Sequence, residues 1–184
     1  MFIGTDQSKR STAAVMLNPD GSMKDFTLIC LADEDEELIL KQWEYFDDWV
    51  CQNAFPENLK GALIEGLSFG SVGSGKDFLA GLQWYFRSQF KACYGLFLGT
   101  TPVSQWRSKV LTKEEQREAK KEGKDGLKKA CVAKLPADVR ERFSEYLAEH
   151  EQELRKVKKS LWKDCIFDLC DAHFIAQYRL SLEQ

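Results

Sequence analysis

The pattern of apolar and polar residues predicts three short strands at the start of the chain. Apolar residues dominate Phe2–Asp6, Thr12–Leu17 and Lys24–Cys30, and each run has the length of a strand. Asn18–Gly21 reads NPDG, in which the proline presets φ for a turn and the glycine accepts a positive φ. Short links of this kind join antiparallel neighbours, so the three strands are predicted to form a meander.

The middle of the chain alternates between helical and strand patterns. A helix is expected after the acidic stretch near Asp33, because the apolar residues that follow recur at helical spacing. Gly61–Gly66 and Gly95–Thr100 are short apolar runs, and a helical segment from about Ser74 to Cys93 separates them. This order of strand, helix and strand predicts that the later part of the sheet is parallel.

The last third of the chain has a different character. From Thr100 to Pro136 the sequence is polar and basic with weak periodicity, so we expect loop and helix with some mobility. Two helices, at about Ala137–Lys159 and Ser160–Leu182, are expected to close the chain. With 184 residues and no internal repeat or low-complexity linker, the chain is predicted to be one domain spanning residues 1–184.

Composition narrows the class of protein. Hydrophobic residues make up 43% of the chain and charged residues 30%, as in ordinary soluble globular proteins. No apolar run is long enough for a membrane span, and the first residues lack the pattern of a signal peptide, so we expect a cytoplasmic protein that does not bind membranes. The six cysteines show no disulfide or zinc-site spacing and are interpreted as reduced thiols, mostly in the core.

Charge is separated along the sequence, although the formal net charge is only −3. Residues 33–48 hold eight acidic residues and one lysine, whereas residues 107–134 hold ten basic and five acidic residues. Such a chain can bind a phosphate backbone on one side while remaining acidic overall. Taken alone, the basic stretch is also typical of an ordinary solvated helix.

Several carboxylates are candidates for metal chemistry. Asp164, Asp168 and Asp171 are spaced to project from one face of a helix, where like charges repel and a divalent cation would convert repulsion into coordination. Asp6 lies in the first strand and Glu65 ends a later one. Each has an ordinary alternative, a turn or cap residue or a solvated helix face. Together they match a two-metal site built from hard oxygen ligands.

Three segments carry a family resemblance. IGTDQSKRSTAAVML, ALIEGLSFGS and FDLCDAHFIAQY resemble, in order and separation, the motifs of the RuvC family of Holliday-junction resolvases. The resemblance implies an α/β, ribonuclease H-like fold with a five-stranded mixed sheet, three antiparallel strands followed by parallel strands, flanked by helices. It also implies that Asp6, Glu65, Asp168 and Asp171, below the acidic tetrad, are the catalytic residues and metal ligands.

The activity that this resemblance implies is that of a crossover junction endodeoxyribonuclease. A homodimer would resolve four-way DNA junctions by paired symmetric nicks that leave 5′ phosphates, using two Mg²⁺ ions per active site, for which Mn²⁺ would substitute. Such a protein would serve DNA recombination and repair, and a phage or mobile-element member would work in the host cytoplasm. Two alternatives stay open: a nuclease of this fold acting on other branched DNA or RNA–DNA hybrids, and a non-catalytic junction-binding protein.

The resemblance also suggests DNA-binding residues. They are Phe69, Lys76, Arg107, Lys109, Lys128 and Lys129. The family tends to place an aromatic residue three positions after its strand-four glutamate, but here that position is Ser68, so Phe69 is either a wedge at the junction centre or a packing residue. The family also usually has a glycine where this chain reads STAA, and Asp164 has no counterpart.

A competing motif overlaps one of these residues. Gly70–Asp77 reads GSVGSGKD and fits the phosphate-binding loop of nucleotide-binding proteins, but it has Asp77 where that motif needs Ser or Thr. We therefore expect no nucleotide cofactor and interpret Lys76 as a DNA phosphate contact, with Ser74 as a helix cap. His173 lies about 200° around the helix from Asp171, so a surface or packed histidine is expected there.

Overall fold

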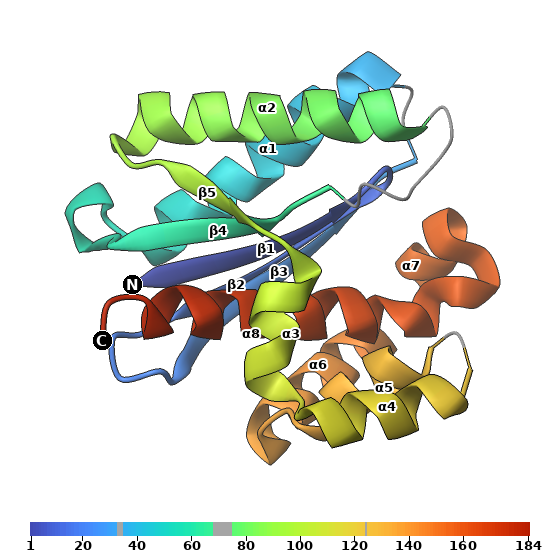
Figure 1. Cartoon of the computed structure of the whole chain (residues 1–184). Helices are drawn as coiled ribbons and strands as arrows, with labels where there is room; N and C mark the ends of the chain where they lie inside the picture. Colours follow the sequence, from blue (N-terminus) through green and yellow to red (C-terminus); the bar gives the residue numbers. More distant parts are fainter. Residues whose placement is uncertain (33–34, 68–74, 124) are drawn as a thin grey trace.

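A mixed sheet forms the centre of the molecule (Figure 1). The computed structural model describes residues 1–32, 35–67, 75–123 and 125–184, with the backbone alone at 35–36 and 75–76. Within them the sheet has five strands in the order β3-β2-β1-β4-β5. They are β1 (Phe2–Ser8), β2 (Ser11–Leu17), β3 (Met23–Cys30), β4 (Gly61–Glu65) and β5 (Leu98–Thr101). The first three pair antiparallel, and β1, β4 and β5 pair parallel, so the predicted mixed sheet is confirmed.

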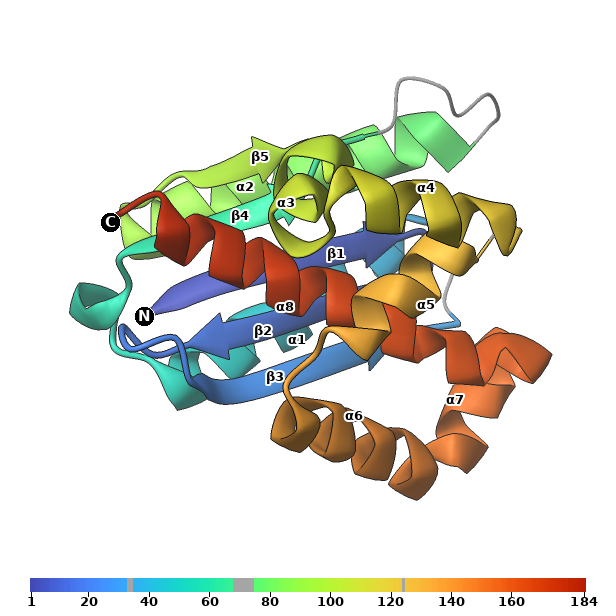
Figure 2. The same ribbon diagram turned by 60° about the horizontal axis from the view of Figure 1, so that its bottom comes forward.

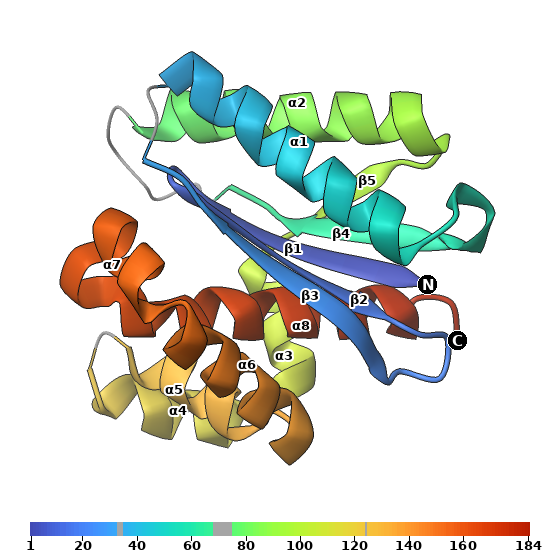
Figure 3. The ribbon, with the colours of Figure 1, turned by 180° about the vertical axis from the view of Figure 1, so that it is seen from behind.

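Helices cover both faces of the sheet. The described helices are α1 (Asp35–Asn53), α2 (Gly75–Tyr94), α3 (Val103–Val110), α4 (Lys113–Lys121), α5 (Gly126–Ala133), α6 (Ala137–Glu149), α7 (Glu151–Lys158) and α8 (Cys165–Ser181), with short 3-10 turns η1 (Pro56–Asn58) and η2 (Lys159–Asp164). Helices α1 and α2 cover one face, as the view from behind in Figure 3 also shows. Helix α8 runs along the other face, with α3 and α4 on one side of it and α6 and α7 on the other (Figure 2).

Each face of the sheet has its own hydrophobic core. Strand β2 is buried along its whole length, and its side chains alternate between the two cores. Ala13, Val15 and Leu17 pack with the residues of α8, whereas Ala14 and Met16 pack with those of α1 and α2. The central strands are therefore fixed from both sides. No described helix is long and apolar enough to cross a membrane.

Helix α8 lies unusually close to β1, and the sequence allows this at one glycine. A Cβ atom placed on Gly4 would lie 2.2 Å from the carbonyl oxygen of Ala172 and 2.2 Å from the backbone nitrogen of Ala176. Any side chain at this position would thus collide with the helix backbone. The absence of a side chain sets the distance between β1 and the helix that carries two residues of the acidic tetrad.

The basic segment after β5 is more helical than its weak periodicity predicts. It forms α3, α4 and α5, and α4 begins with a capping box in which the side chain of Thr112 accepts from the backbone N–H of Glu115 and the Glu115 side chain accepts from the backbone N–H of Thr112. This T-x-x-E signal is present in the sequence. The amphipathic pattern is weak because these short helices bury few residues each, among them Trp106, Ala119 and Cys131.

The long helix predicted at Ala137–Lys159 is wrong, because the structure divides it. Helix α6 ends at Glu149 and α7 starts at Glu151, with His150 between them in a non-helical conformation. The imidazole of His150 stacks on Tyr146 at 4.1 Å and its Nδ1 lies 2.9 Å from the Tyr146 carbonyl oxygen, which fixes the break. Helix α7 then ends at Lys158, and the next residue, Lys159, has a positive φ of 53°.

The cysteines are distributed unevenly over the two faces, and all six have free thiols. Cys131, Cys165 and Cys170 are buried on the side of α8, and Cys30 is half-buried beside them. Cys51 on α1 and Cys93 on α2 are exposed. The prediction of mostly buried thiols therefore holds for the α8 side of the sheet alone.

Candidate active site

Two carboxylates of the acidic tetrad lie at the ends of adjacent parallel strands. The pairing of β1 with β4 runs to Thr5 and Ile64, so Asp6 and Glu65 are the next residues along the two strands. The backbone at Glu65 is fixed by α2, because Gln83 Nε2 donates to the Glu65 carbonyl oxygen at 2.5 Å. The parallel arrangement thus brings both side chains to one edge of the sheet.

The other two carboxylates reach the same place from α8. Gly4 contacts α8 at Ala172, and Asp6 points to the same face of β1 as Gly4 because side chains alternate along a strand. Asp168 and Asp171 lie within the turn of α8 that precedes Ala172, which places them over Asp6. The close contact at Gly4 therefore positions the helical carboxylates against the strand carboxylates.

Electrostatics shows that the four carboxylates are close enough to affect one another. Burial raises the pKa of Asp6 well above its usual range, and the charges of Glu65, Asp168 and Asp171 raise it further. Burial, followed by the charge of Glu65, raises the pKa of Asp171 to about 7. Burial also raises the pKa values of Glu65 and Asp168. Full ionisation of the tetrad at neutral pH therefore requires added positive charge.

The tetrad offers oxygen atoms to a cation. Glu65 Oε2 and Asp171 Oδ1 are buried without a hydrogen-bond partner among the described residues, and such atoms are costly unless a ligand satisfies them. Carboxylate oxygens are the ligands that Mg²⁺ and Mn²⁺ prefer. As the side chains stand, no three His, Cys, Asp or Glu residues in the described part of the chain are gathered around one point. The chemistry of the donor set, carboxylate oxygens that are buried and in part without a partner, fits a divalent cation.

Arg107 faces the acidic tetrad. Its Nη2 lies 3.7 Å from Asp171 Oδ2, its side chain is only 16% exposed, and its charge opposes the rise in the pKa of Asp171. The guanidinium packs over the ring of Trp106 at 4.8 Å. Burial raises the pKa of Glu65, and the nearby buried indole N–H of Trp106 opposes this rise, although it makes no hydrogen bond. Helix α3 therefore contributes one cation and one dipole to the site.

Lys128 and Lys129, neighbours on α5, point in different directions. Lys128 is half-buried, and its charge opposes the rise in the pKa values of all four carboxylates. Its ammonium group lies 5.4 Å from the centre of the Phe167 ring. Lys129 is exposed to solvent. Of this predicted pair, only Lys128 belongs to the surroundings of the tetrad.

A third basic residue, Lys158, is part of the site and was missed in the sequence. Its Nζ lies 3.8 Å from Asp168 Oδ2 and donates to Ser11 Oγ at 2.7 Å. Ser11 Oγ donates in turn to Asp168 Oδ2 at 3.3 Å. Lys158 lies among several lysines near the end of α7, and nothing in the sequence separates it from them, because its role depends on how α7 packs against the sheet.

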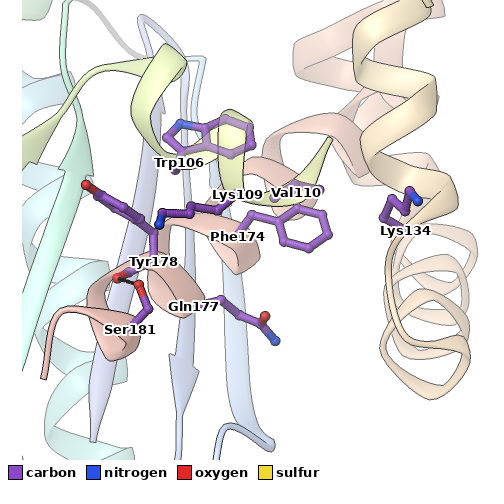
Figure 4. Close-up of a pocket in the computed structure, with 8 residues that line it drawn as sticks. All are labelled: Trp106, Lys109, Val110, Lys134, Phe174, Gln177, Tyr178 and Ser181. Carbon is purple, nitrogen blue, oxygen red and sulfur yellow. Dashed lines mark hydrogen bonds between the residues drawn. The ribbon is translucent and has the colours of Figure 1, made fainter. Parts of the chain in front are cut away.

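Lys109 lies in a different place. It lines a pocket of about 400 Å³ between α3 and the C-terminal half of α8, together with Trp106, Val110, Lys134, Phe174, Gln177, Tyr178 and Ser181 (Figure 4). Asp168 and Asp171 are in the N-terminal half of α8. The pocket thus lies further along α8 than Asp168 and Asp171, and Lys109 borders the pocket.

The other residues considered in the sequence analysis are Phe69, Lys76, Asp164 and His173. Phe69 lies outside the described residues, as does most of the Gly70–Asp77 loop, and only the backbone is described at Lys76. Asp164 is exposed at the end of η2 and raises the pKa of Asp168 through its charge. His173 is buried in the core, where burial lowers its pKa to about 4, so the expectation of a packed histidine is confirmed.

The order and direction of the strands define the fold class. A five-stranded sheet in the order 3-2-1-4-5, antiparallel then parallel, with helices on both faces, is the ribonuclease H-like fold of RuvC. One similar structure is T. thermophilus RuvC in complex with Holliday junction substrate, with a TM-score of 0.60, 8% identity, and coverage of 100% of this chain and 96% of that chain.

A second similar structure is Thermus thermophilus RuvC, with a TM-score of 0.53, 9% identity, and coverage of 98% of this chain and 94% of that chain. No family model matches the chain, and no curated protein matches it in sequence. The likeness therefore extends over the whole described fold and is one of structure, not of sequence.

Proposed function

We propose that residues 1–184 form a single nuclease domain, a divalent-metal-dependent endonuclease that resolves four-way DNA junctions by paired symmetric nicks. The observation that carries the proposal is the convergence of four carboxylates, from β1, β4 and α8, with three basic side chains at one edge of the sheet. Carboxylates of this number suit two cations, and cations among them suit a phosphate substrate. The likeness of the fold to RuvC supports the choice of substrate.

Each residue of the site has a role in this proposal. Asp6, Glu65, Asp168 and Asp171 would hold two Mg²⁺ or Mn²⁺ ions. The bound ions would supply an activated water for in-line attack and stabilise the charge on the leaving 3′ oxygen, so that the product carries a 5′ phosphate. Gln83 holds the backbone of Glu65, and the contact of Gly4 with α8 holds the helical carboxylates in place.

The basic residues divide into two groups by their position. Arg107 and Lys128 lie among the carboxylates, where they would neutralise the tetrad and orient the phosphate next to the cleaved bond. Lys129 is exposed on α5 and Lys109 borders the pocket of Figure 4, so both would contact phosphates further along the DNA arms. Phe69 and Lys76 are retained as proposed contacts near the junction centre.

A substrate panel tests the proposal. Purified protein is incubated with a synthetic four-way junction, linear duplex, a flap, a replication fork and an RNA–DNA hybrid, with Mg²⁺ or with EDTA. We expect Mg²⁺-dependent nicks at symmetric positions in the four-way junction and none in linear duplex. Preferred cleavage of flaps, forks or hybrids would identify a different nuclease of this fold, and junction binding without cleavage would identify a binding protein.

Symmetric cleavage requires two active sites, so a twofold homodimer is part of the proposal. Mixing wild-type protein with an excess of Asp6→Asn should give dimers with one working site. On a junction carried in a supercoiled plasmid, such dimers should nick one strand only, whereas wild-type dimers should produce linear product. If the subunits exchange and the mixture still gives the same ratio of linear plasmid to nicked plasmid as wild type, the dimer is contradicted.

A further inference from the structure

Lys158 occupies a position that structural stability does not explain. Its side chain is 19% exposed and makes a contact of 2.7 Å to Ser11 Oγ, 3.5 Å to Ser8 Oγ and 3.8 Å to Asp168 Oδ2. Removing an ammonium group and a carboxylate from water costs free energy, and a partly buried ion pair is weak evidence for stabilisation. All three contacts are polar, and they join Lys158 to a carboxylate of the tetrad and to the turn between β1 and β2, not to the hydrophobic core.

The backbone directly after Lys158 is strained. The next residue, Lys159, has φ 53° and ψ −126°, a conformation that non-glycine residues rarely adopt. Lys159 follows α7 and begins η2. The last side chain of α7, that of Lys158, reaches the tight turn between β1 and β2, where Ser8 pairs with Ser11. Strain of this kind persists where the surrounding structure requires the geometry.

Lys158 and a metal ion would compete for the same carboxylate. In the structure, Asp168 Oδ2 is shared by Lys158 and Ser11. A divalent cation held by Asp168 would lie within a few ångströms of the ammonium group, and the two positive charges would repel. A DNA phosphate attracted by the same cation is an anion that could then receive Lys158. The two serine hydroxyls can accept or donate hydrogen bonds, so they remain satisfied when Lys158 leaves.

We propose that Lys158 is a further phosphate-binding residue, stored on Asp168 and the Ser8–Ser11 turn in the metal-free protein and transferred to the DNA when a divalent cation takes Asp168. The inference rests on the proposed function, because it needs a metal at the tetrad and DNA beside it. It predicts that Lys158 contributes to DNA binding only when metal is present.

Metal binding without DNA gives the first test. Lys158→Met keeps the length of the side chain and removes its charge, and Lys156→Met, on the exposed side of α7, is the matched control. Calorimetry with Mn²⁺ at pH 8 should show at least threefold tighter binding to Lys158→Met than to wild type, and no change for Lys156→Met. Weaker Mn²⁺ binding would overturn the inference, because Lys158 would then be orienting Asp168 for the metal.

DNA binding with and without metal gives the second test. With Ca²⁺ in place of Mg²⁺, Lys158→Met should bind a four-way junction at least threefold more weakly, with a salt slope lower by about 0.9 for one lost phosphate contact. In EDTA the variant should bind like wild type. Equal weakening in both buffers, or in neither, would overturn the inference.

A double variant tests whether Asp168 is the group that holds Lys158 away from DNA. In an Asp168→Asn background Lys158 has lost its counter-ion, so the effect of Lys158→Met on junction binding should appear in EDTA as well. Its absence there would count against the inference. If wild type cuts junctions and Lys158→Met behaves like wild type in every assay, this inference fails and the proposed function stands. If wild type binds Mn²⁺ and junctions as described but cuts nothing, the proposed function fails instead.

Discussion

Asp171 is a carboxylic acid whose charged form is costly in the folded chain. Its pKa rises from an ordinary value of 3.8 to about 7, chiefly because it is buried and then because Glu65 is near. Between these pH values the native state binds a proton that the unfolded chain has lost. The free energy of unfolding of the metal-free protein therefore falls as the pH rises from 4 to 7.

This shift gives a prediction for stability and activity together. Asp171→Asn should raise the free energy of unfolding in EDTA at pH 8 by about 1–2 kcal/mol, since it removes a buried charge and its repulsion with Glu65. It should abolish cleavage and leave junction binding largely intact, because phosphate contacts come from basic residues. Urea unfolding at pH 5 and pH 8 and junction assays check this, with exposed Asp164→Asn as the control. Wild-type turnover with Asp171→Asn would contradict the assignment of the tetrad.

His173 has the opposite effect on stability. Burial between Phe143 and Phe174 lowers its pKa from 6.5 to about 4, so the folded chain resists protonation that the unfolded chain accepts. Stability is therefore lost as the pH falls from 6.5 to 4.

His173→Gln should remove the loss of stability that protonation of His173 causes at low pH. The difference in the free energy of unfolding between pH 7 and pH 4.5 should shrink by about 2–3 kcal/mol relative to wild type. Urea denaturation at the two pH values measures it, and His150→Gln, at the break between α6 and α7, is the control. The same pH dependence in both variants would show that His173 is not the source.

At the scale of elements, the contact between β1 and α8 determines whether the site exists. Gly4→Ala would place a methyl group 2.2 Å from backbone atoms of Ala172 and Ala176, so it should destabilise the protein by about 2–3 kcal/mol and reduce cleavage by displacing α8. Gly81→Ala, in α2, meets only a side-chain atom at 4.0 Å and should stabilise by up to about 1 kcal/mol. Denaturant unfolding and cleavage rates of both variants test the contrast. Equal stability of the two would contradict the close approach of α8.

Helix α5 presents its two lysines to different surroundings. Lys128→Gln should lower the free energy of unfolding at pH 8 in EDTA by about 0.5–1 kcal/mol, because Lys128 offsets the repulsion within the tetrad. Lys129→Gln should leave stability unchanged and lower the salt slope of junction binding by about 0.9, as one exposed phosphate contact would. Unfolding curves and salt titrations separate the two effects. Identical behaviour of the variants would mean that they share one environment.

The sheet and its covering helices could be predicted from the sequence because their signals are local. Strands β1 to β3 are short apolar runs joined by clear turn residues, and the order of β4, α2 and β5 indicates parallel pairing. The break between α6 and α7 has no such signal. No proline or glycine marks it, and the stacked pair at the break, Tyr146 and His150, has an i,i+4 spacing that an unbroken helix also brings together.

The same distinction applies to the site. The four carboxylates could be predicted as a group because strand ends and helical spacing are visible in the sequence, and because the motifs resemble a known family. The basic residues were found only in part. The rotation and packing of short helices decide which basic residues face the tetrad, and neither the hydrophobic pattern nor the number of charges in the sequence reveals them. This applies to Arg107, Lys109, Lys128 and Lys158.

For the whole molecule, metal should act as a stabilising ligand that competes with protons. Adding 10 mM Mg²⁺ at pH 8 should raise the melting temperature by a few degrees, because the ion binds the native tetrad and not the unfolded chain. At pH 5.5 the gain should be smaller, since the pKa values of the tetrad are raised and protons then occupy its oxygens. Asp6→Asn should reduce the gain at both pH values. A gain that is independent of pH and of Asp6 would indicate metal binding elsewhere.

The uneven distribution of thiols makes the molecule convenient for spectroscopy. Cys51 and Cys93 are exposed on α1 and α2, whereas Cys131, Cys165 and Cys170 are buried on the face that carries the tetrad. Partial loss of solvent around its sulfur, followed by the charge of Asp47, raises the pKa of Cys93, so a maleimide dye at neutral pH should react first with Cys51. A fluorophore attached there would sit across the sheet from the carboxylates. It would report the approach of a second labelled subunit or of dye-carrying DNA by energy transfer without occupying the surface under study.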